Sequence, residues 1–180
     1  MITEAYILAG GKSSRMGEDK ATMVFKGKPM IQWTIDSLSQ LSLEIKISSS
    51  NPSHEKFGLE VVNDRHQNIG PIGAIYSCLQ DAKSDSVLIT CCDYPLLNTA
   101  FYQALMMAYN NEEVFIATSN FKAHPLIGVY SQSCLPVIEK NISEGQYKVM
   151  ESVKKCNFRE FNADGFEPLL KNINEKLDIH

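Results

Sequence analysis

The residues with the clearest chemical potential lie in one stretch, residues 8–20, which reads L-A-G-G-K-S-S-R-M-G-E-D-K. Gly10 and Gly11 follow a short apolar segment. Because glycine lacks a Cβ, an anionic or planar ligand can lie against main-chain N–H groups there. Three cations surround the same loop: Lys12, Arg15 and Lys20. Glycines, hydroxyls and cations in this order predict a loop that wraps a nucleotide and its phosphates.

Two familiar phosphate-binding patterns are excluded by spacing. The P-loop pattern requires a glycine five residues before Gly-Lys-Ser, but the residue five positions before Gly11 is Tyr6. The dinucleotide fingerprint G-x-G-x-x-G occurs nowhere in the chain. The loop therefore predicts phosphate chemistry of another kind.

A second candidate group is a carboxylate that follows the strongest strand in the sequence. Residues 86–92 form a nearly continuous apolar run, typical of the buried centre of a parallel sheet, and Asp93 follows directly. An acidic side chain at the carboxyl end of a central strand is well placed to hold a cation, although a helix N-cap or a turn would also use an aspartate. Asp64 follows a shorter strand, residues 59–62, at the edge where ligands gather in open α/β sheets.

The elements that must position these groups alternate between strands and helices. We expect strands over residues 5–9, 45–48, 59–62, 86–92 and 114–118, and helices over residues 29–41, 70–79 and 100–109. Pro29 suits the first position of the first helix, and a short helix should open at Asn51 and end at Gly58. The alternation predicts one domain, residues 1–180, built on a single doubly wound, mostly parallel sheet with helices on both faces.

Composition narrows the class of protein. A chain of 180 residues with 44% hydrophobic content can fill one core, and a net charge of −4 argues against a nucleic-acid partner. Between positions 12 and 28, however, the sequence has five basic residues and two acidic ones. This local excess of positive charge would attract a small polyanion. The five cysteines show no C-x-x-C spacing, and no apolar run approaches the roughly 18 residues of a membrane span. We expect a reduced, soluble, cytoplasmic protein with no membrane partner.

The glycine and lysine stretch resembles the signature of the MobA-like nucleotidyltransferases, written loosely as L-A-G-G-x-x-x-R-M-G-x-D-K. The match runs without a gap through Lys20. Further matches are Gly27-Lys28-Pro29 to the family's G-K-P, Gly70-Pro71-Ile72-Gly73 to its G-P-x-x-G, Cys92-Asp93-Tyr94-Pro95 to its C-D-x-P, and Asn172-Ile173-Asn174 to its N-x-N. A glycine hairpin with surface lysines would not require Arg, Met, Gly, Asp and Lys in this order.

This resemblance implies a Rossmann-like nucleotidyltransferase fold and transfer of GMP from GTP to molybdopterin or Mo-molybdopterin, with release of pyrophosphate. It assigns to the nucleotide Leu8, Ala9, Gly10, Gly11, Lys20, Asp64 and Asp93, and to catalysis Arg15, Lys20 and Asp93. In it Arg15 and Lys20 hold the triphosphate, Asp64 contacts the guanosine, and Asp93 binds Mg²⁺. The implied partners are GTP, molybdopterin, and the proteins that deliver molybdopterin or mature molybdoenzymes.

The acceptor side is less sharply defined. His124 resembles the histidine of the family's H-P segment on that side of the cleft, but a structural histidine would fit the sequence equally well. Asn172 and Asn174 would contact phosphate or metal, unless Asn174 caps a terminal helix. One departure is visible, because the family often has an asparagine near the nucleoside where this chain has Ser49, with Asn51 two residues later.

No general base is required for the implied reaction. The attacking group is a phosphomonoester, whose second pKa of about 6 leaves it largely ionised at neutral pH. Catalysis would then rest on holding two anions in line and neutralising the charge that develops.

Three alternatives stay open at this point. A cytidylyltransferase would make the cytosine form of the cofactor. The pair Gly10-Gly11, where those relatives commonly have Ala-Gly, favours guanine because a purine can approach the backbone. A sugar-phosphate nucleotidylyltransferase would usually be longer after the equivalent of Asp93. A non-catalytic nucleotide-binding adaptor would keep the loop but would not need Asp93.

Overall fold

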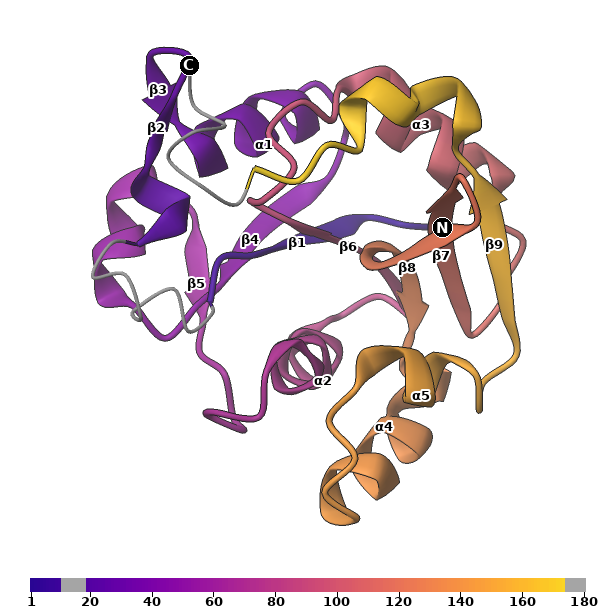
Figure 1. Cartoon of the computed structure of the whole chain (residues 1–180). Coiled ribbons are helices and arrows are strands. Elements are labelled where there is room, and N and C mark those ends of the chain that lie inside the picture. The colour runs from indigo at the N-terminus through magenta and orange to yellow at the C-terminus, as the bar shows by residue number, and fades with distance from the viewer. Residues whose placement is uncertain (11–18, 174–180) are drawn as a thin grey trace.

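A seven-stranded sheet with helices on both faces forms the body of the protein in the computed structural model, which describes residues 1–10 and 19–173 (Figure 1). Its strands are β1 (Glu4–Leu8), β4 (Glu44–Ser48), β5 (Glu60–Val62), β6 (Ser86–Cys91), β7 (Val114–Ser119), β8 (Lys122–Ser131) and β9 (Phe158–Asn162). Their order across the sheet is β5-β4-β1-β6-β8-β7-β9. Only β8 among these strands runs antiparallel to its neighbours. The predicted mostly parallel sheet is confirmed.

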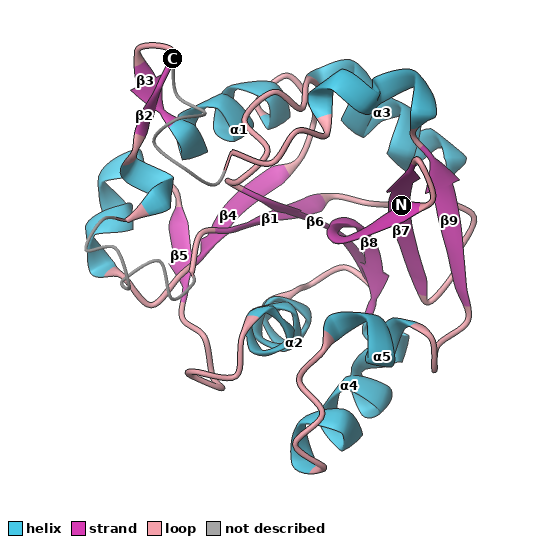
Figure 2. Cartoon of the chain, in the orientation of Figure 1, coloured by secondary structure: helices cyan, strands magenta, loops and turns pink. Residues whose placement is uncertain are grey.

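The helices divide between the two faces of the sheet (Figure 2). One face carries α1 (Met30–Leu38) and α3 (Thr99–Ala108), and the other carries α2 (Pro71–Asp81), α4 (Leu135–Ser143) and α5 (Val149–Val153). Short 3₁₀ helices connect them: η2 (Lys20–Thr22), η3 (Pro52–Phe57), η4 (Gln132–Cys134) and η5 (Asp164–Leu169). The doubly wound arrangement expected from the sequence is therefore present. Within the described residues, no helix is long and apolar enough to cross a membrane.

The start of α1 differs slightly from the prediction. Residues 24–29 form a small hairpin of β2 (Val24–Phe25) and β3 (Lys28–Pro29), so Pro29 ends a strand and precedes the helix. The N–H of Met30 donates to Met23 O at 2.8 Å, which fixes the hairpin against the first helical residue. Trp33 donates its indole N–H to Phe25 O at 2.9 Å. This second contact ties the helix to the same hairpin.

The last third of the chain does not keep the predicted strand–helix alternation. Strands β7 and β8 form a hairpin whose turn residues, Asn120 and Phe121, both have positive φ angles of 48° and 59°. The pairing shifts register beside Ile116, and Gly128 lies so close to Phe115 there that a Cβ would come within 2.3 Å of the Phe115 carbonyl oxygen. Such an irregularity redirects side chains, and residues 125–127 of β8 lie within it.

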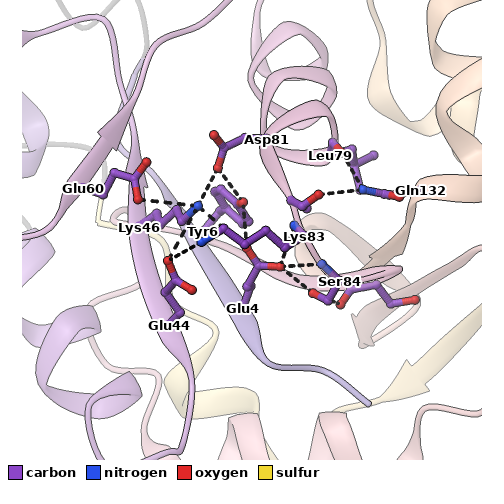
Figure 3. A network of polar contacts seen from close by, with 12 residues as sticks. Glu4, Tyr6, Glu44, Lys46, Glu60, Leu79, Asp81, Lys83, Ser84 and Gln132 are labelled. Carbon is purple, nitrogen blue, oxygen red and sulfur yellow. Dashed lines mark hydrogen bonds and ion pairs between the residues drawn. The ribbon is translucent and has the colours of Figure 1, made fainter.

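A buried ionic cluster closes the amino edge of the sheet (Figure 3). The side chain of Lys46 in β4 is only 2% exposed, and its Nζ lies 2.8 Å from Asp81 Oδ2 and 3.7 Å from Glu4 Oε1. Tyr6 donates its hydroxyl to Asp81 Oδ2 at 2.8 Å, and Ser84 donates through both N and Oγ to Glu4 Oε2. Strands β1 and β4 are thereby joined to the end of α2.

Ion pairs and hydrogen bonds keep Glu4, Lys46 and Asp81 ionised despite their burial. Burial alone would raise the pKa values of Glu4 and Asp81, but hydrogen bonds and the charge of Lys46 lower them below their usual range. Burial alone would lower the pKa of Lys46, but the hydrogen bond and charge of Asp81 raise it. All three groups are therefore charged at neutral pH.

We expect Lys46→Met to lower the free energy of unfolding by roughly 3 kcal/mol at pH 7, because it leaves Glu4 and Asp81 without their cation. Urea unfolding would measure the loss. The matched control is Lys83→Met, since the Lys83 side chain is 74% exposed, pairs with Glu44 at 3.6 Å, and should contribute less than about 1 kcal/mol. Equal losses in the two variants would contradict the buried-cluster interpretation.

The same cluster predicts a pH dependence. Because Glu4 and Asp81 have lowered pKa values in the folded protein, their stabilisation is complete above their ordinary pKa values. It is lost as the pH falls through the lowered values. The stability difference between wild type and Lys46→Met should therefore shrink below about pH 4, and a difference independent of pH would contradict the assignment.

Candidate active site

A cleft of about 840 Å³ opens at the carboxyl edge of the sheet, where β1, β4, β5 and β6 end. The described part of its wall consists of residues 8–10, 48–50, 67–71 and 91–93, together with Lys20, Asp64, Ala74 and Leu126. A cleft of this size suits a small-molecule ligand, and its position follows the rule that ligands bind beyond the carboxyl ends of strands in open α/β sheets.

The first strand delivers the beginning of the glycine loop to this cleft. Leu8 ends β1, and the N–H of Ala9 donates to Ser48 O at 3.0 Å, so the chain leaves the sheet beside β4. A Cβ at Gly10 would meet only ordinary contacts at 3.9 Å. Protein packing alone thus does not require glycine at this position, and close approach of a ligand remains the reason that the sequence suggests. Gly11 and Arg15 lie outside the described residues.

Lys20 and Asp93 meet inside the cleft. Lys20 opens η2, Asp93 follows β6, and Lys20 Nζ lies 3.6 Å from Asp93 Oδ2, with both side chains a quarter to a third exposed. Asp93 does not cap a helix, because Asn98 caps α3 by accepting a hydrogen bond from Phe101 N, but it does lie in a turn, as the other alternative expected. A cation and an accessible carboxylate at one point can hold a phosphate and a metal ion side by side.

Asp64 reaches the cleft from the loop after β5. Its Oδ1 accepts hydrogen bonds from His66 N at 3.1 Å and Ser77 Oγ at 3.3 Å, while burial raises the pKa of the carboxyl above its usual value. Gly73 in α2 makes this arrangement possible. A Cβ there would lie 2.6 Å from His66 O and 3.0 Å from Asp64 Oδ1. The second glycine of the G-P-x-x-G segment therefore allows the Asp64 turn to pack on the helix.

Two residues predicted for the acceptor side, His124 and Asn172, lie outside the described cleft wall. His124 is buried, and its Nδ1 lies 3.2 Å from Tyr94 Oη. Burial, with a smaller contribution from the charge of Lys122, lowers the pKa of His124, so it is neutral at pH 7. Burial raises the pKa of Tyr94, and a hydrogen bond with Asn172 partly offsets that effect.

These contacts support the turn that holds Asp93. Tyr94 is its direct neighbour in the chain, and Ile173 N donates to Asp93 O at 2.9 Å. Neither His124 nor Asn172 is part of the described cleft wall. Their contact with the acceptor stays a prediction, and Asn174 lies outside the described residues.

Several cleft residues were not predicted from the sequence. Ser50 follows β4, and Gln67 and Asn68 lie in the loop after β5. Their position beyond strand ends was the available signal. Ser49 lines the cleft, whereas Asn51 does not and instead donates its Nδ2 to Asp19 Oδ2 at 3.0 Å. At the position after β4 where the resemblance expects an asparagine, the cleft wall therefore has Ser49.

The donor chemistry fits Mg²⁺. No group of three or more His, Cys, Asp or Glu side chains gathers to hold a metal within residues 1–10 and 19–173. Mg²⁺ typically takes one or two carboxylates and completes its octahedron with phosphate oxygens and water, so it does not need such a group. Asp93 is the accessible carboxylate that would serve, with Lys20 beside it for the phosphates.

Gly10, Lys20 and Asp93 lie together at the carboxyl ends of the strands, which is where open α/β sheets bind nucleotides and other ligands. A model of the MobA-like NTP transferase domain matches residues 5–156, and the chain belongs to this family of nucleotidyltransferases. Similarity to individual proteins extends over nearly the whole chain. A probable molybdenum cofactor guanylyltransferase of Flavobacterium johnsoniae is 33% identical over 177 residues, which cover 97% of this chain and 93% of the relative.

Another relative and two solved structures are similar to this chain over nearly its whole length. A probable molybdenum cofactor guanylyltransferase of Pyrococcus horikoshii is 31% identical, covering 98% of this chain and 96% of the relative. The crystal structure of a putative protein from Aquifex aeolicus has a TM-score of 0.80 at 26% identity, covering 97% and 95% of the two chains. The crystal structure of molybdopterin-guanine dinucleotide biosynthesis protein A from Archaeoglobus fulgidus has a TM-score of 0.80 at 21% identity, covering 98% of this chain and 95% of that chain. This second structure shows that the two proteins share a fold.

We expect Gly73→Ala to destabilise the protein by about 1–3 kcal/mol, because the new methyl group must displace His66 O and the Asp64 carboxylate. It should also weaken nucleotide binding, since Asp64 lines the cleft. Urea unfolding and nucleotide titration would measure both effects. Gly165→Ala is the matched control, as a Cβ at Gly165 meets nothing within 4 Å. Equal behaviour of the two variants would contradict the packing argument.

Proposed function

We propose that the protein transfers GMP from GTP to molybdopterin or Mo-molybdopterin, forming the guanine dinucleotide form of the cofactor and releasing pyrophosphate, with Mg²⁺ as its metal ion. The observation that supports this most is the Lys20–Asp93 pair at 3.6 Å, inside a cleft that residues 8–10 also line. Relatives that share 31–33% of their residues with this chain, over nearly its full length, are named probable molybdenum cofactor guanylyltransferases.

The reaction makes one phosphorus–oxygen bond and breaks another. A terminal phosphate oxygen of molybdopterin attacks the α-phosphorus of GTP, the bond from that phosphorus to the β-phosphate oxygen breaks, and pyrophosphate leaves with the bonding electrons. The attacking phosphate is already ionised at neutral pH, so no side chain has to remove a proton. The described cleft accordingly needs to supply position and charge.

Each cleft residue then has a separate role. Lys20 neutralises the triphosphate charge that grows as pyrophosphate departs, and Asp93 would hold Mg²⁺ against the same phosphates. When bound, Mg²⁺ withdraws electron density from the phosphate oxygens. The main-chain groups of residues 8–10 face the base, and Asp64 contacts the guanosine. Arg15, which the sequence also assigns to the triphosphate, lies outside the described residues.

Base choice would be made chiefly by the main chain. Guanine presents acceptors at O6 and N7 and donors at N1 and N2, so backbone N–H and C=O groups can recognise it without a dedicated side chain. We expect GTP to be preferred over CTP by at least about tenfold, equivalent to about 1.4 kcal/mol. Pyrophosphate release from each NTP, with molybdopterin supplied, tests this. Equal rates, or a preference for CTP, would instead indicate a cytidylyltransferase. From the sequence, Gly11→Ala should narrow the ratio.

Asp93→Asn should remove at least about 99% of turnover while leaving the protein folded, because the amide occupies the same space but binds Mg²⁺ poorly. Pyrophosphate release measures turnover, and urea unfolding measures the folded state. The control Asp85→Asn alters an exposed aspartate outside the described cleft wall and should retain wild-type turnover. Wild-type rates in Asp93→Asn would show that this carboxylate does not hold the metal.

A further inference from the structure

The turn that carries Lys20 is anchored by a histidine from a distant part of the chain. His54 lies in η3, between β4 and β5, and its side chain is fully buried. Its Nε2 is 2.5 Å from Oδ2 of Asp19, the residue immediately before Lys20. At that distance the ring N–H donates to the carboxylate, and a hydrogen bond to a charged acceptor is about twice as strong as a neutral one.

Protein contacts engage every oxygen of Asp19. Its Oδ2 also accepts from Asn51 Nδ2 at 3.0 Å, and its Oδ1 accepts from Ala21 N at 3.1 Å, which caps η2. Its main-chain oxygen accepts from Thr22 N at 3.0 Å and from Thr22 Oγ1 at 2.9 Å. Asp19 is also not part of the described cleft wall, so it serves to hold this turn.

Asn51 and His54 also have contacts within their own loop. Asn51 N donates to Ser49 Oγ at 3.0 Å, and Asn51 Oδ1 accepts from Ser53 N at 3.0 Å. The ring of His54 packs against Phe57, with ring centroids 6.1 Å apart. Gly58 ends the helix with a φ of 73°. The loop after β4 therefore lines the cleft through Ser49, and through Asn51 and His54 it holds Asp19, the cap of the turn that begins at Lys20.

An external anchor is needed here for a physical reason. The helix η2 has three residues, and a single 3₁₀ turn has too few internal hydrogen bonds to be stable alone. Without its contacts to His54 and Asn51, the Asp19 carboxylate would be free to leave the cap position. The backbone of Lys20 would then lose its fixed place opposite Asp93.

We propose that His54, together with Asn51, is a positioning residue for the transfer reaction. Its hydrogen bond to Asp19 fixes the backbone of Lys20, so that the ammonium group reaches the triphosphate while His54 itself touches no substrate. This inference rests on the proposed function, since phosphate contact by Lys20 is part of it.

A double-mutant cycle on nucleotide binding tests the inference. We expect His54→Leu to raise the Kd of a fluorescent GTP analogue with Mg²⁺ by about tenfold, through loss of a charged hydrogen bond. Lys20→Ala should also raise the Kd, and adding His54→Leu to Lys20→Ala should weaken binding no further. Fully additive effects would overturn the proposal, because His54 would then act independently of Lys20.

Rescue by a conservative variant gives a second readout. His54→Gln keeps an N–H donor near the position of Nε2 and should restore the Kd to within about threefold of wild type. A Kd as high as that of His54→Leu, in a folded His54→Gln protein, would contradict the proposal. If His54→Leu fails to fold, Asn51→Asp takes its place in the cycle. It keeps the acceptor for Ser53 N but removes the donor to Asp19.

Tyr6→Phe is the matched control for stability. It removes a hydrogen bond to Asp81 at the opposite edge of the sheet, and should lower stability without changing the Kd. If another NTP binds the wild-type protein more tightly than GTP, the cycle uses the fluorescent analogue of that NTP instead. Failure of the proposed function would appear as a preference for a base other than guanine, whereas failure of this inference would appear as additivity.

Discussion

The parallel pairing of β1 with β6 is the constraint on which the rest of the site depends. The register joins Ala5 to Leu88 and continues to Leu8 and Cys91, and Cys92 N donates to Leu8 O at 3.3 Å beyond the strand end. Because both strands are buried on both faces, a slip of one residue would turn core side chains the wrong way. Residues 9–10 and Asp93, which follow these two strands, must therefore lie beside each other.

The two edges of the sheet use charge in opposite ways. At the amino ends of the strands, Lys46 is almost fully buried and lies 2.8–3.8 Å from the carboxylates of Glu4, Glu44, Glu60 and Asp81 (Figure 3). Glu4 and Asp81 also accept hydrogen bonds from Ser84 and Tyr6, which favours a fixed structure. At the carboxyl edge, Lys20 and Asp93 are 3.6 Å apart and partly exposed in a cleft. The attraction within a partly exposed ion pair contributes little to stability, so a ligand that binds either charge disturbs the fold little.

Sequence patterns predicted the parts of the fold and site that depend on local signals. Continuous apolar runs identified β1 and β6. The strand-end rule placed Asp64 and Asp93 at the carboxyl ends of the strands, and the family resemblance assigned Leu8, Ala9, Gly10 and Lys20 to the nucleotide. All six residues line the cleft. Strand β9 was not predicted, because it is a largely exposed edge strand. The β7–β8 hairpin was not predicted either, because its Asn120-Phe121 turn contains no glycine. The His54–Asp19 contact joins residues 35 positions apart, and no local pattern reports such a contact.

We propose above that Asp93, beside Lys20, holds the divalent metal of a metal–nucleotide complex at the carboxyl ends of β1 and β6. Mn²⁺ can replace Mg²⁺ as a paramagnetic probe, and the electron paramagnetic resonance signal of free Mn²⁺ measures its binding with and without GTP. The account predicts that GTP strengthens Mn²⁺ binding to the wild-type protein and that Asp93→Asn raises the Kd of Mn²⁺ in the presence of GTP by at least about tenfold. An unchanged Mn²⁺ affinity in a folded Asp93→Asn protein would contradict it.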